Sequence, residues 1–371
     1  MKYARTNAIR SIFLLAICLS LVPAAALAQT TKKRTCGSNP GQSLQQFLNE
    51  LNPGDTLIVS GTCNENVLIH EGFGNITVDG QGTAVINGSA NPNAATVTIR
   101  GRGITLKGFT IIGGRHGVQI HRSGTATVDR NTIMSAANHG VGVLDNGTAR
   151  IVDNVIEGNG ANGICVCEHS VADIGFRGDF ATAGSPNIVR NNGNSGIVVA
   201  DASYAEIESN QILGNANAGI SVDNSSSAKI GAQSGVAGTF ANGNTIQQNG
   251  NRGIVVARSS SARIVENKIR NNTGDGVSVV RGSQADVAAN AIDGNTGNGV
   301  LVSQNSGVNL GSDGGTAVQD QPNSTTANNG AAGILCGINS FLDGRQGTLN
   351  GITGGPLNIV PNSGCVNSLI P

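Results

Sequence analysis

The chain has 371 residues, with 23 Lys and Arg against 23 Asp and Glu, so its formal net charge is zero and no basic run supports nucleic-acid binding. Glycine contributes 54 residues and aromatic residues only 3%, which argues against a coiled coil or another long-helix protein. Apolar residues make up 38% of the chain and recur in an ordered pattern, which argues against disorder.

The first 28 residues have the pattern of a secretory signal peptide. Basic residues precede an apolar stretch, residues 11–22, that is too short for a membrane span, and an Ala-Leu-Ala sequence places cleavage before Gln29. No later segment is apolar enough to cross a bilayer. The sequence therefore predicts an exported protein, periplasmic or extracellular, without a membrane span.

A short N-terminal cap is expected over residues 29–55. Within it, residues 43–51 have the pattern of an amphipathic helix, with Ser43 as N-cap and Gln46 three residues on. Such a cap covers the first coil of a repeat protein, whose exposed edge would otherwise invite aggregation.

Six cysteines follow the predicted cleavage site. Their positions favour one disulfide near each end of the chain, Cys36–Cys63 and Cys336–Cys365. An oxidising compartment would preserve both bridges. Cys165 and Cys167 are two residues apart on one face of a predicted strand, where a bridge is hard to form without distortion. Free thiols, a strained bridge and soft metal ligands all stay open for this pair.

A Gly-[Val/Ile]-x-[Ile/Val] tetrad, ending in Cys in its last copy, recurs every 23 residues, or every 33 or 34 where an insertion intervenes. The nine tetrads begin at Gly117, Gly140, Gly163, Gly196, Gly219, Gly253, Gly276, Gly299 and Gly333. Each period also holds an Ala-x-[Ile/Val] run and an Asn-x-[Ile/Val] run, such as Ala149-Arg150-Ile151 and Asn154-Val155-Ile156. Alternation over three or four residues indicates short half-buried strands. Three such strands per period predict an all-β parallel β-helix.

Two rows of asparagine repeat with the same period. One runs from Asn131 to Asn290 and is expected to end at Ser324, and the other runs from Asn159 to Asn329. Stacked amides can hydrogen-bond from coil to coil. We expect the β-helix over residues 56–336, with about 11–12 coils, followed by a loop-rich C-terminal cap over residues 337–371.

The tetrads and the Asn-x-Ile runs resemble the right-handed parallel β-helix proteins of the pectin-lyase-like superfamily, over roughly Thr56 to Cys336. The resemblance implies a right-handed coil and contact with acidic polysaccharides, as in lyases, hydrolases, epimerases and cell-surface modules. The motifs of polygalacturonase-like enzymes are missing, because Asn131-Thr132 is followed by Ile133 where that pattern has Asp, and no Asp-Asp pair occurs.

The candidate site lies at the fifth place after the tetrad glycine in consecutive coils. The candidate catalytic residues are Arg122, Asp145, Glu168 and Asp201, with His121 beside them. Secondary candidates are His169 beside the same row and His116 and His139, which stack just before their glycines. Carboxylates about 5 Å apart repel each other unless a cation relieves them, so Asp145, Glu168 and Asp201 could hold calcium that bridges to a uronate. A solvated turn edge is the alternative.

Charged residues also alternate on the outward side of the Ala-x-[Ile/Val] strands. The expected ion pairs between neighbouring coils are Arg150–Asp173, Glu206–Lys229 and Arg263–Asp286. Three insertions, residues 175–186, 231–243 and 311–323, enter at one corner and project from one side of the rod. Their bulky or charged residues include Phe176, Arg177, Asp179, Phe180, Phe240, Asp313 and Asp320.

Three functions fit these observations. The sequence favours a non-catalytic exported module that binds polysaccharide or another envelope component. A lyase, hydrolase or epimerase acting on acidic polysaccharide is the alternative, and a structural spacer or adhesin arm is the third. Calcium is the only cofactor that the pattern indicates, and the sequence leaves open whether the protein is an enzyme.

Overall fold

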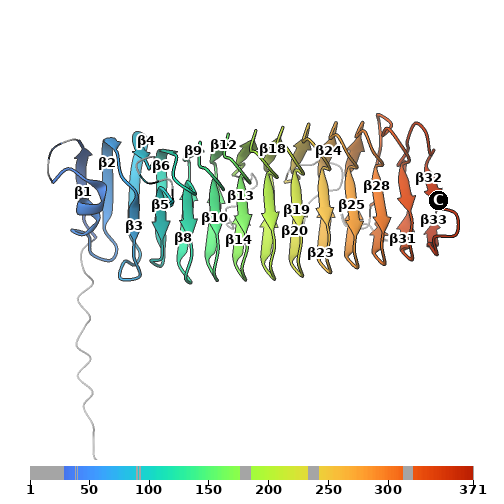
Figure 1. The fold of residues 1–371 in the computed structure, drawn as a ribbon, viewed down its shortest axis with the longest axis horizontal. Coiled ribbons are helices and arrows are strands. Elements are labelled where there is room, and N and C mark those ends of the chain that lie inside the picture. Colours follow the sequence, from blue (N-terminus) through green and yellow to red (C-terminus); the bar gives the residue numbers. More distant parts are fainter. Residues whose placement is uncertain are drawn as a thin grey trace, which may run out of the picture.

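The computed structural model describes residues 29–37, 39, 41–88, 91, 93–175, 185–232, 242–311 and 321–370. The coils stack into one rod of about 13 turns, in the chain order that the repeats predict (Figure 1). The sequence underestimated this number at 11–12, because the first and last coils lack the regular tetrad. The predicted signal peptide and the named residues of the three insertions lie outside the described residues.

The nine tetrad strands and the matching strands of the first and last coils form one parallel 12-stranded sheet. It contains β3 (Val67–Ile69), β5 (Val97–Ile99), β7 (Val118–Ile120), β10 (Val141–Val143), β13 (Ile164–Val166), β16 (Ile197–Val199), β19 (Ile220–Val222), β22 (Ile254–Val256), β25 (Val277–Val280), β28 (Val300–Ser303), β30 (Ile334–Cys336) and β32 (Leu357–Ile359). Each strand begins with an aliphatic residue that points into the rod. These residues form the buried ladder that the spacing predicts, fully buried from Val118 to Ile334.

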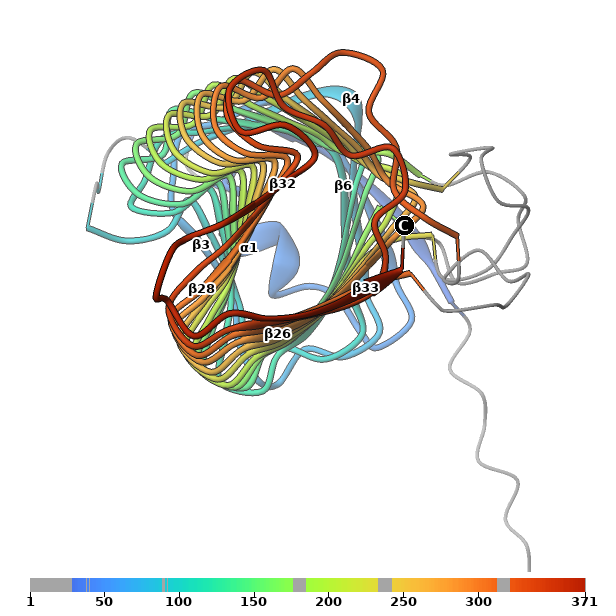
Figure 2. The ribbon, with the colours of Figure 1, turned by 90° about the vertical axis from the view of Figure 1, so that its right-hand side faces the viewer.

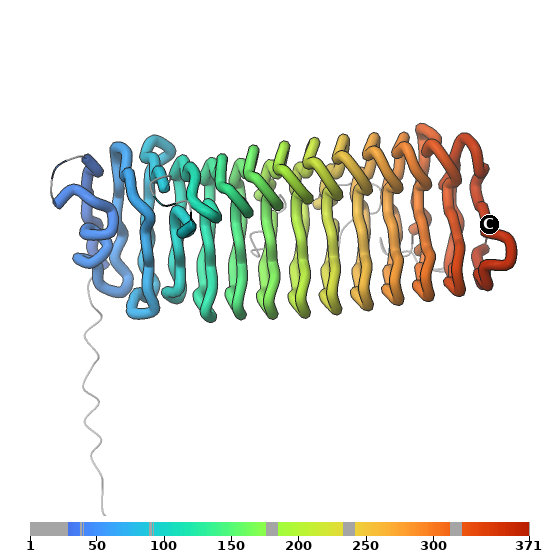
Figure 3. The backbone as a smooth tube through the Cα atoms, viewed as in Figure 1, coloured from blue at the N-terminus to red at the C-terminus, as the bar shows by residue number. Residues whose placement is uncertain are grey.

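The other two strands of each coil belong to one 21-stranded sheet. The second strands are β8 (Thr125–Asp129), β11 (Thr148–Val152), β14 (Val171–Ile174), β17 (Tyr204–Ile207), β20 (Ser227–Gly231), β23 (Ser261–Val265), β26 (Gln284–Ala288), β29 (Gly307–Leu310), β31 (Phe341–Arg345) and β33 (Val366–Ile370). The third strands are β9 (Thr132–Met134), β12 (Val155–Glu157), β15 (Ile188–Arg190), β18 (Gln211–Leu213), β21 (Thr245–Gln247), β24 (Lys268–Arg270) and β27 (Ala291–Asp293). The two series are joined because the long early strand β6 (Ile104–Ile112) pairs with both β8 and β9. The tube in Figure 3 shows how regularly the later coils repeat.

Both asparagine rows are buried hydrogen-bonded ladders. In the first, each Nδ2 donates to Oδ1 of the next amide at 2.9–3.1 Å. This ladder ends at Asn323, where the sequence interpretation had placed Ser324. The second ladder has the same bonds at 2.9–3.0 Å. A serine ladder, which the sequence analysis missed, runs from Ser170 to Ser340 through backbone N–H to Oγ bonds of 3.1–3.3 Å.

The N-terminal end is covered as predicted, by a helix shorter than expected. The rod begins with β1 (Thr31–Cys36), β2 (Thr56–Cys63) and β4 (Thr77–Asn87), and α1 (Leu44–Leu48) lies across its N-terminal end (Figure 2). Ser43 Oγ caps the helix by accepting from the Gln46 backbone N–H at 3.2 Å. The Glu65 carboxylate also accepts from the Leu44 and Gln45 backbone N–H groups, at 2.6 and 3.1 Å.

The C-terminal part corrects the sequence interpretation. Strands β31, β32 and β33 continue the stack beyond Cys336, and β33 pairs in parallel with β31. Residues 337–370 therefore add coils and are not the loop-rich cap that was expected. Both predicted end disulfides, Cys36–Cys63 and Cys336–Cys365, are present. In the described part of the chain, no helix is long and apolar enough to cross a membrane.

Candidate functional site

The predicted catalytic row lies at a tight corner between the first and second strands. Arg122, Asp145, Glu168 and Asp201 have φ values of 49–59°, in the left-handed region, and their side chains are exposed. Backbone hydrogen bonds join neighbouring residues of the row. The N–H of the residue that follows each row member donates to the carbonyl oxygen of the row member in the next coil, at 3.0–3.1 Å. The prediction that these residues stack coil on coil is correct.

The carboxylates of this corner row are not gathered into a set of metal ligands. Within the described ranges, the only three potential ligands whose donor atoms lie within 4.8 Å of each other are Cys36, Cys63 and Glu65, and the two cysteines are already bonded to each other. Asp201 Oδ1 accepts instead from Asn224 Nδ2 at 2.9 Å. The geometry therefore favours the solvated turn edge over a calcium site.

The two stacked histidines do come together. The rings of His116 and His139 lie 5.2 Å apart with planes inclined at 28°, as the sequence predicted. Burial lowers the pKa of both imidazoles to about 4, helped for His116 by the neighbouring His139. His116 Nδ1 is buried without a hydrogen-bond partner among the described residues. Both rings are therefore neutral near pH 7, which makes them poor proton donors there.

The other two histidines of the predicted site do not join this pair. His121 Nε2 accepts from Arg100 Nε at 3.0 Å, and burial, Arg100 and Arg122 lower the pKa of its imidazole. His169 is exposed at the corner, next to Glu168. The predicted constellation thus separates into a solvated corner and a stacked imidazole pair.

Cys165 and Cys167 form a disulfide, one of the three alternatives that the sequence left open. Residues two apart in a straight strand are separated by ~6.6 Å at Cα, which is at the upper end of the range for a disulfide. Here the Cα separation is 5.8 Å, because β13 ends at Val166 and the chain has begun to bend. The bridge packs on Ala200, Leu144 and Val198, so it covers part of the outward face of the tetrad sheet.

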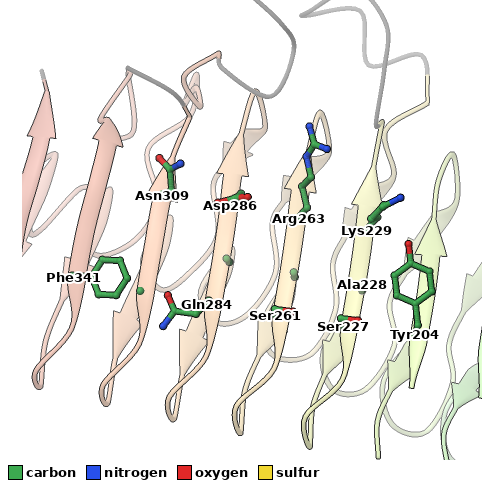
Figure 4. Close-up of a pocket in the computed structure, with 13 residues that line it drawn as sticks. Tyr204, Ser227, Ala228, Lys229, Ser261, Arg263, Gln284, Asp286, Asn309 and Phe341 are labelled. Atoms are coloured by element: carbon green, nitrogen blue, oxygen red, sulfur yellow. The ribbon is translucent and has the colours of Figure 1, made fainter. Parts of the chain in front are cut away.

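A longer feature lies on the outward face of the second strands. A groove of about 410 Å³ crosses six neighbouring coils, from β17 to β31 (Figure 4). We call it the aromatic groove, because Tyr204 stands at one end and Phe341 at the other. Between them, the strand register places four small or polar residues in one row, Ser227, Ser261, Gln284 and Gly307.

Phe341 is an exposed aromatic surface inside this groove. Its side chain is 44% exposed, and its ring covers Gly307, where an added Cβ would lie 2.0 Å from Phe341 Cζ. Only a residue without a side chain leaves room for the ring in this position. The exposed ring offers the kind of apolar face on which a sugar ring can rest.

Charged side chains form the second row of the groove. The strand register aligns Lys229, Arg263 and Asp286 in consecutive coils, next to Glu206, which does not line the groove. Of the three ion pairs predicted for this face, only Lys229–Glu206 is formed, at 2.8 Å. In the described part of the chain, Arg263 makes no ion pair with Asp286 or with any other residue, and its side chain is half-buried and points away from Asp286 (Figure 4). The groove thus holds a guanidinium group that is available to an external anion.

Sequence reasoning named these charged residues and interpreted them only as surface pairs. It missed the aromatic groove, because Phe341 lies in the part that was expected to be a cap. One feature of the sequence could have indicated the groove. Tyr204 is the only tyrosine after the predicted signal peptide, and it occupies the same place in the repeat as the small residues of the groove.

Comparison with known proteins supports the fold. Residues 74–234 match a model of periplasmic copper-binding proteins, NosD, and residues 231–314 match a model of the right-handed β-helix region. A mutant of the periplasmic alginate epimerase AlgG aligns with 88% of this chain and 83% of its own, at a TM-score of 0.54 and 14% identity. A double mutant of the same enzyme gives a TM-score of 0.53 over 89% of this chain and 83% of its own, at 14% identity. The chain therefore has the fold of a right-handed parallel β-helix, which it shares with these solved structures.

One curated relative is similar in sequence. A cell surface glycoprotein of Methanothermus fervidus is 28% identical over 128 residues, which are 34% of this chain. The aligned part spans only 21% of that protein. The sequence likeness thus covers one segment of a much longer relative.

The described residues do not form a copper site. Copper(I) prefers thiolate, thioether and imidazole ligands. All six cysteines of the described chain are oxidised to disulfides. The His116 and His139 rings are stacked, so the in-plane lone pairs of their nitrogens run side by side and do not converge on one point. The described residues therefore offer no set of ligands for the copper that the matching family is named for.

Proposed function

We propose that this protein is an exported β-helix module whose aromatic groove binds an acidic polysaccharide of the cell envelope, with the sugar chain running along the rod. The observation that carries the proposal is the guanidinium of Arg263, which forms no ion pair with any described residue, in a groove that has an aromatic ring at each end. A guanidinium group recognises a carboxylate through two parallel hydrogen bonds. The similar solved structures are alginate epimerases by name, and alginate is an acidic polysaccharide.

The spacing of the coils suits a polymer. Neighbouring coils lie ~4.8 Å apart, close to the length of one sugar ring, so successive sugars can meet equivalent positions in successive coils. Three disulfides support export, because such bonds persist in oxidising compartments. The matching family is periplasmic by description and the curated relative is a cell surface protein by name.

Affinity electrophoresis of the mature protein tests this function. The gels contain polygalacturonate, alginate or neutral hydroxyethyl cellulose, each with calcium and with chelator. We expect retardation by an acidic polymer in both buffers. Arg263→Gln should weaken retention by about 10-fold or more, because a charge-assisted hydrogen bond contributes ~1.5–3 kcal/mol. Phe341→Ala should weaken it as well.

Arg270→Gln is the matched control, because it removes one positive charge from the third strand β24, away from the groove. Glu168→Ala should also leave retention unchanged, since the corner row is not part of the groove. Equal losses of retention in Arg263→Gln and Arg270→Gln would show that the interaction depends only on net charge. Absence of retention on every polymer would refute the proposal and favour a structural spacer.

A further inference from the structure

The charge along the aromatic groove changes sign between two neighbouring coils. Lys229 on β20 and Arg263 on β23 are cationic, and Asp286 on β26 is anionic. Asn309 on β29 follows in the same row with a neutral amide. A polymer that lies along the groove therefore meets two cations, one anion and one amide in successive coils.

Two of these charges are left for a ligand. Lys229 is already bound to the Glu206 carboxylate, at 2.8 Å, so Arg263 is the cation of the groove that has no ion-pair partner among the described residues. Asp286 is exposed, and in the described part of the chain its carboxylate forms no ion pair either. Figure 4 shows that the Arg263 side chain extends away from Asp286. The two opposite charges thus stay separate along the groove.

The coil that carries Asp286 suits an uncharged sugar. Neighbouring coils lie ~4.8 Å apart, close to the length of one sugar ring. A sugar whose carboxylate binds Arg263 therefore places the adjoining sugar over Asp286 and Gln284. A carboxylate accepts hydrogen bonds and the glutamine amide both donates and accepts them. Hydroxyl, acetamido and ammonium groups fit this coil, whereas a second carboxylate would meet a like charge.

The repulsion between Asp286 and such a carboxylate does not require direct contact. A sugar that turns its carboxylate away from the groove still keeps that charge about one Debye length from Asp286, which is ~8–10 Å at physiological salt. Like charges at this separation repel each other weakly, and salt screens the repulsion. The resulting preference should therefore be modest and should grow as the salt concentration falls.

The rest of the groove accepts a repeating pattern of charge. The described lining residues beyond Asp286 carry no charge, because Asn309 offers an amide and Phe341 an exposed ring. Asp343, the register partner of Asn309, does not line the groove. An amide can donate to a carboxylate or bond to a hydroxyl, and an aromatic ring packs on the face of a sugar. Alternating acidic and uncharged sugars therefore fit the row from Arg263 to Phe341 without placing a carboxylate on Asp286.

We propose that the aromatic groove selects an acidic heteropolysaccharide in which uronate units alternate with uncharged or amino sugars. Arg263 binds the carboxylate of one unit, and Asp286 disfavours a carboxylate on the adjoining unit. Specific sites commonly reject a wrong ligand through a like charge of this kind. This inference rests on the proposed function, because the groove must first bind an acidic polymer.

The test is affinity electrophoresis of the mature protein on two polymers that differ only in the spacing of their carboxylates. These are polygalacturonate and its half-methyl-esterified form, and alginate with its half-esterified form is a second pair. At equal carboxylate concentration, we expect stronger retention of the wild type by the half-esterified polymer. Asp286→Asn should raise retention on the fully acidic polymer by about 2–5-fold and leave retention on the half-esterified polymer nearly unchanged. The increase should be larger at about 10 mM salt than at about 150 mM.

Asp145→Asn is the matched control, because it removes the same charge from an exposed carboxylate of the corner row, outside the groove. It should change retention on the two polymers equally. Arg263→Gln should lower retention on both polymers, since both present a carboxylate. Thermal melts check that the exposed Asp286→Asn substitution leaves the fold intact.

The outcomes separate the two proposals. Selection by Asp286 is overturned if the wild type prefers the fully acidic polymer. It is also overturned if Asp286→Asn raises retention on that polymer no more than Asp145→Asn does. In both cases the binding of an acidic polymer still stands. If none of the polymers retains the wild type, both proposals are wrong.

Discussion

Replacing Asn210 by Leu tests whether the first asparagine ladder stabilises the rod. Asn210 is fully buried, and its Nδ2 donates to Asn244 Oδ1 and to the carbonyls of Ile174 and Glu208 at 2.8–3.0 Å. Its Oδ1 accepts from the backbone N–H and the Nδ2 of Asn187, at 3.1 and 2.9 Å. Leucine fills a similar volume and makes none of these bonds.

The magnitude follows from the groups that are left without partners. The two donors of Asn187 lose their acceptor, and each buried unsatisfied group costs ~1–3 kcal/mol. We therefore expect Asn210→Leu to lower the free energy of unfolding by roughly 2–6 kcal/mol. Asn217→Ser is the control, because Asn217 belongs to an exposed row of amides that bond at 3.0 Å in contact with water. Its effect should stay within about 0.5 kcal/mol.

Urea unfolding followed by circular dichroism measures both variants. The comparison uses the midpoint at equal slope, because a changed slope would indicate that a part of the rod unfolds separately. Equal shifts in the two variants would show that the buried amides contribute no more than exposed ones, and the ladder argument would then be wrong.

Three further predictions concern the groove and the bridges. Gly307→Ala should displace the Phe341 ring and weaken polymer retention several-fold with little loss of stability, and unchanged retention would show that the ring position is unimportant. Burial raises the pKa of the Glu208 carboxyl to about 7 from an ordinary 4.5. Between these two values the folded state keeps a proton that the unfolded state has already lost. The stability of the wild type should therefore fall as the pH rises toward and through 7. Glu208→Gln should therefore gain up to ~3 kcal/mol over wild type at pH 8 and little at pH 4, and equal gains at both pH values in urea unfolding would contradict the buried carboxyl. Cys336→Ser opens a bridge of sequence separation 29 and should lower the free energy of unfolding by ~3–4 kcal/mol. Cys165→Ser opens a bridge of separation 2 and should lower it by less than ~2 kcal/mol. A reversed order of the two variants in thermal melts would be inconsistent with the chain-entropy account.

The sequence predicted the fold well because the repeat is its strongest signal. The inward aliphatic residues and the asparagine rows recur with the coil, so their register and burial follow from the spacing alone. The C-terminal coils were missed because their strands, such as Leu357–Ile359, lack the tetrad glycine. Their pairing depends on the preceding coil, which a local pattern does not reveal.

The site was harder to predict because it depends on what the repeats leave unpaired. Spacing correctly stacked Asp145 on Glu168, but it could not show that the left-handed corner directs both side chains into water. Register also suggested that Arg263 pairs with Asp286, as Lys229 pairs with Glu206. Whether two side chains meet depends on their rotamers, so the absence of a partner for Arg263 among the described residues became apparent only in three dimensions.

Each coil of the rod touches mainly the coils before and after it, and one coil corresponds to 23 residues of sequence. A duplication or deletion of one such unit would keep every ladder in phase and change only the length of the rod. The aromatic groove crosses six coils, so the number of sugars it can hold would change in whole steps. Under the proposed function, a gain or loss of repeats would therefore change the length of polymer that the rod binds.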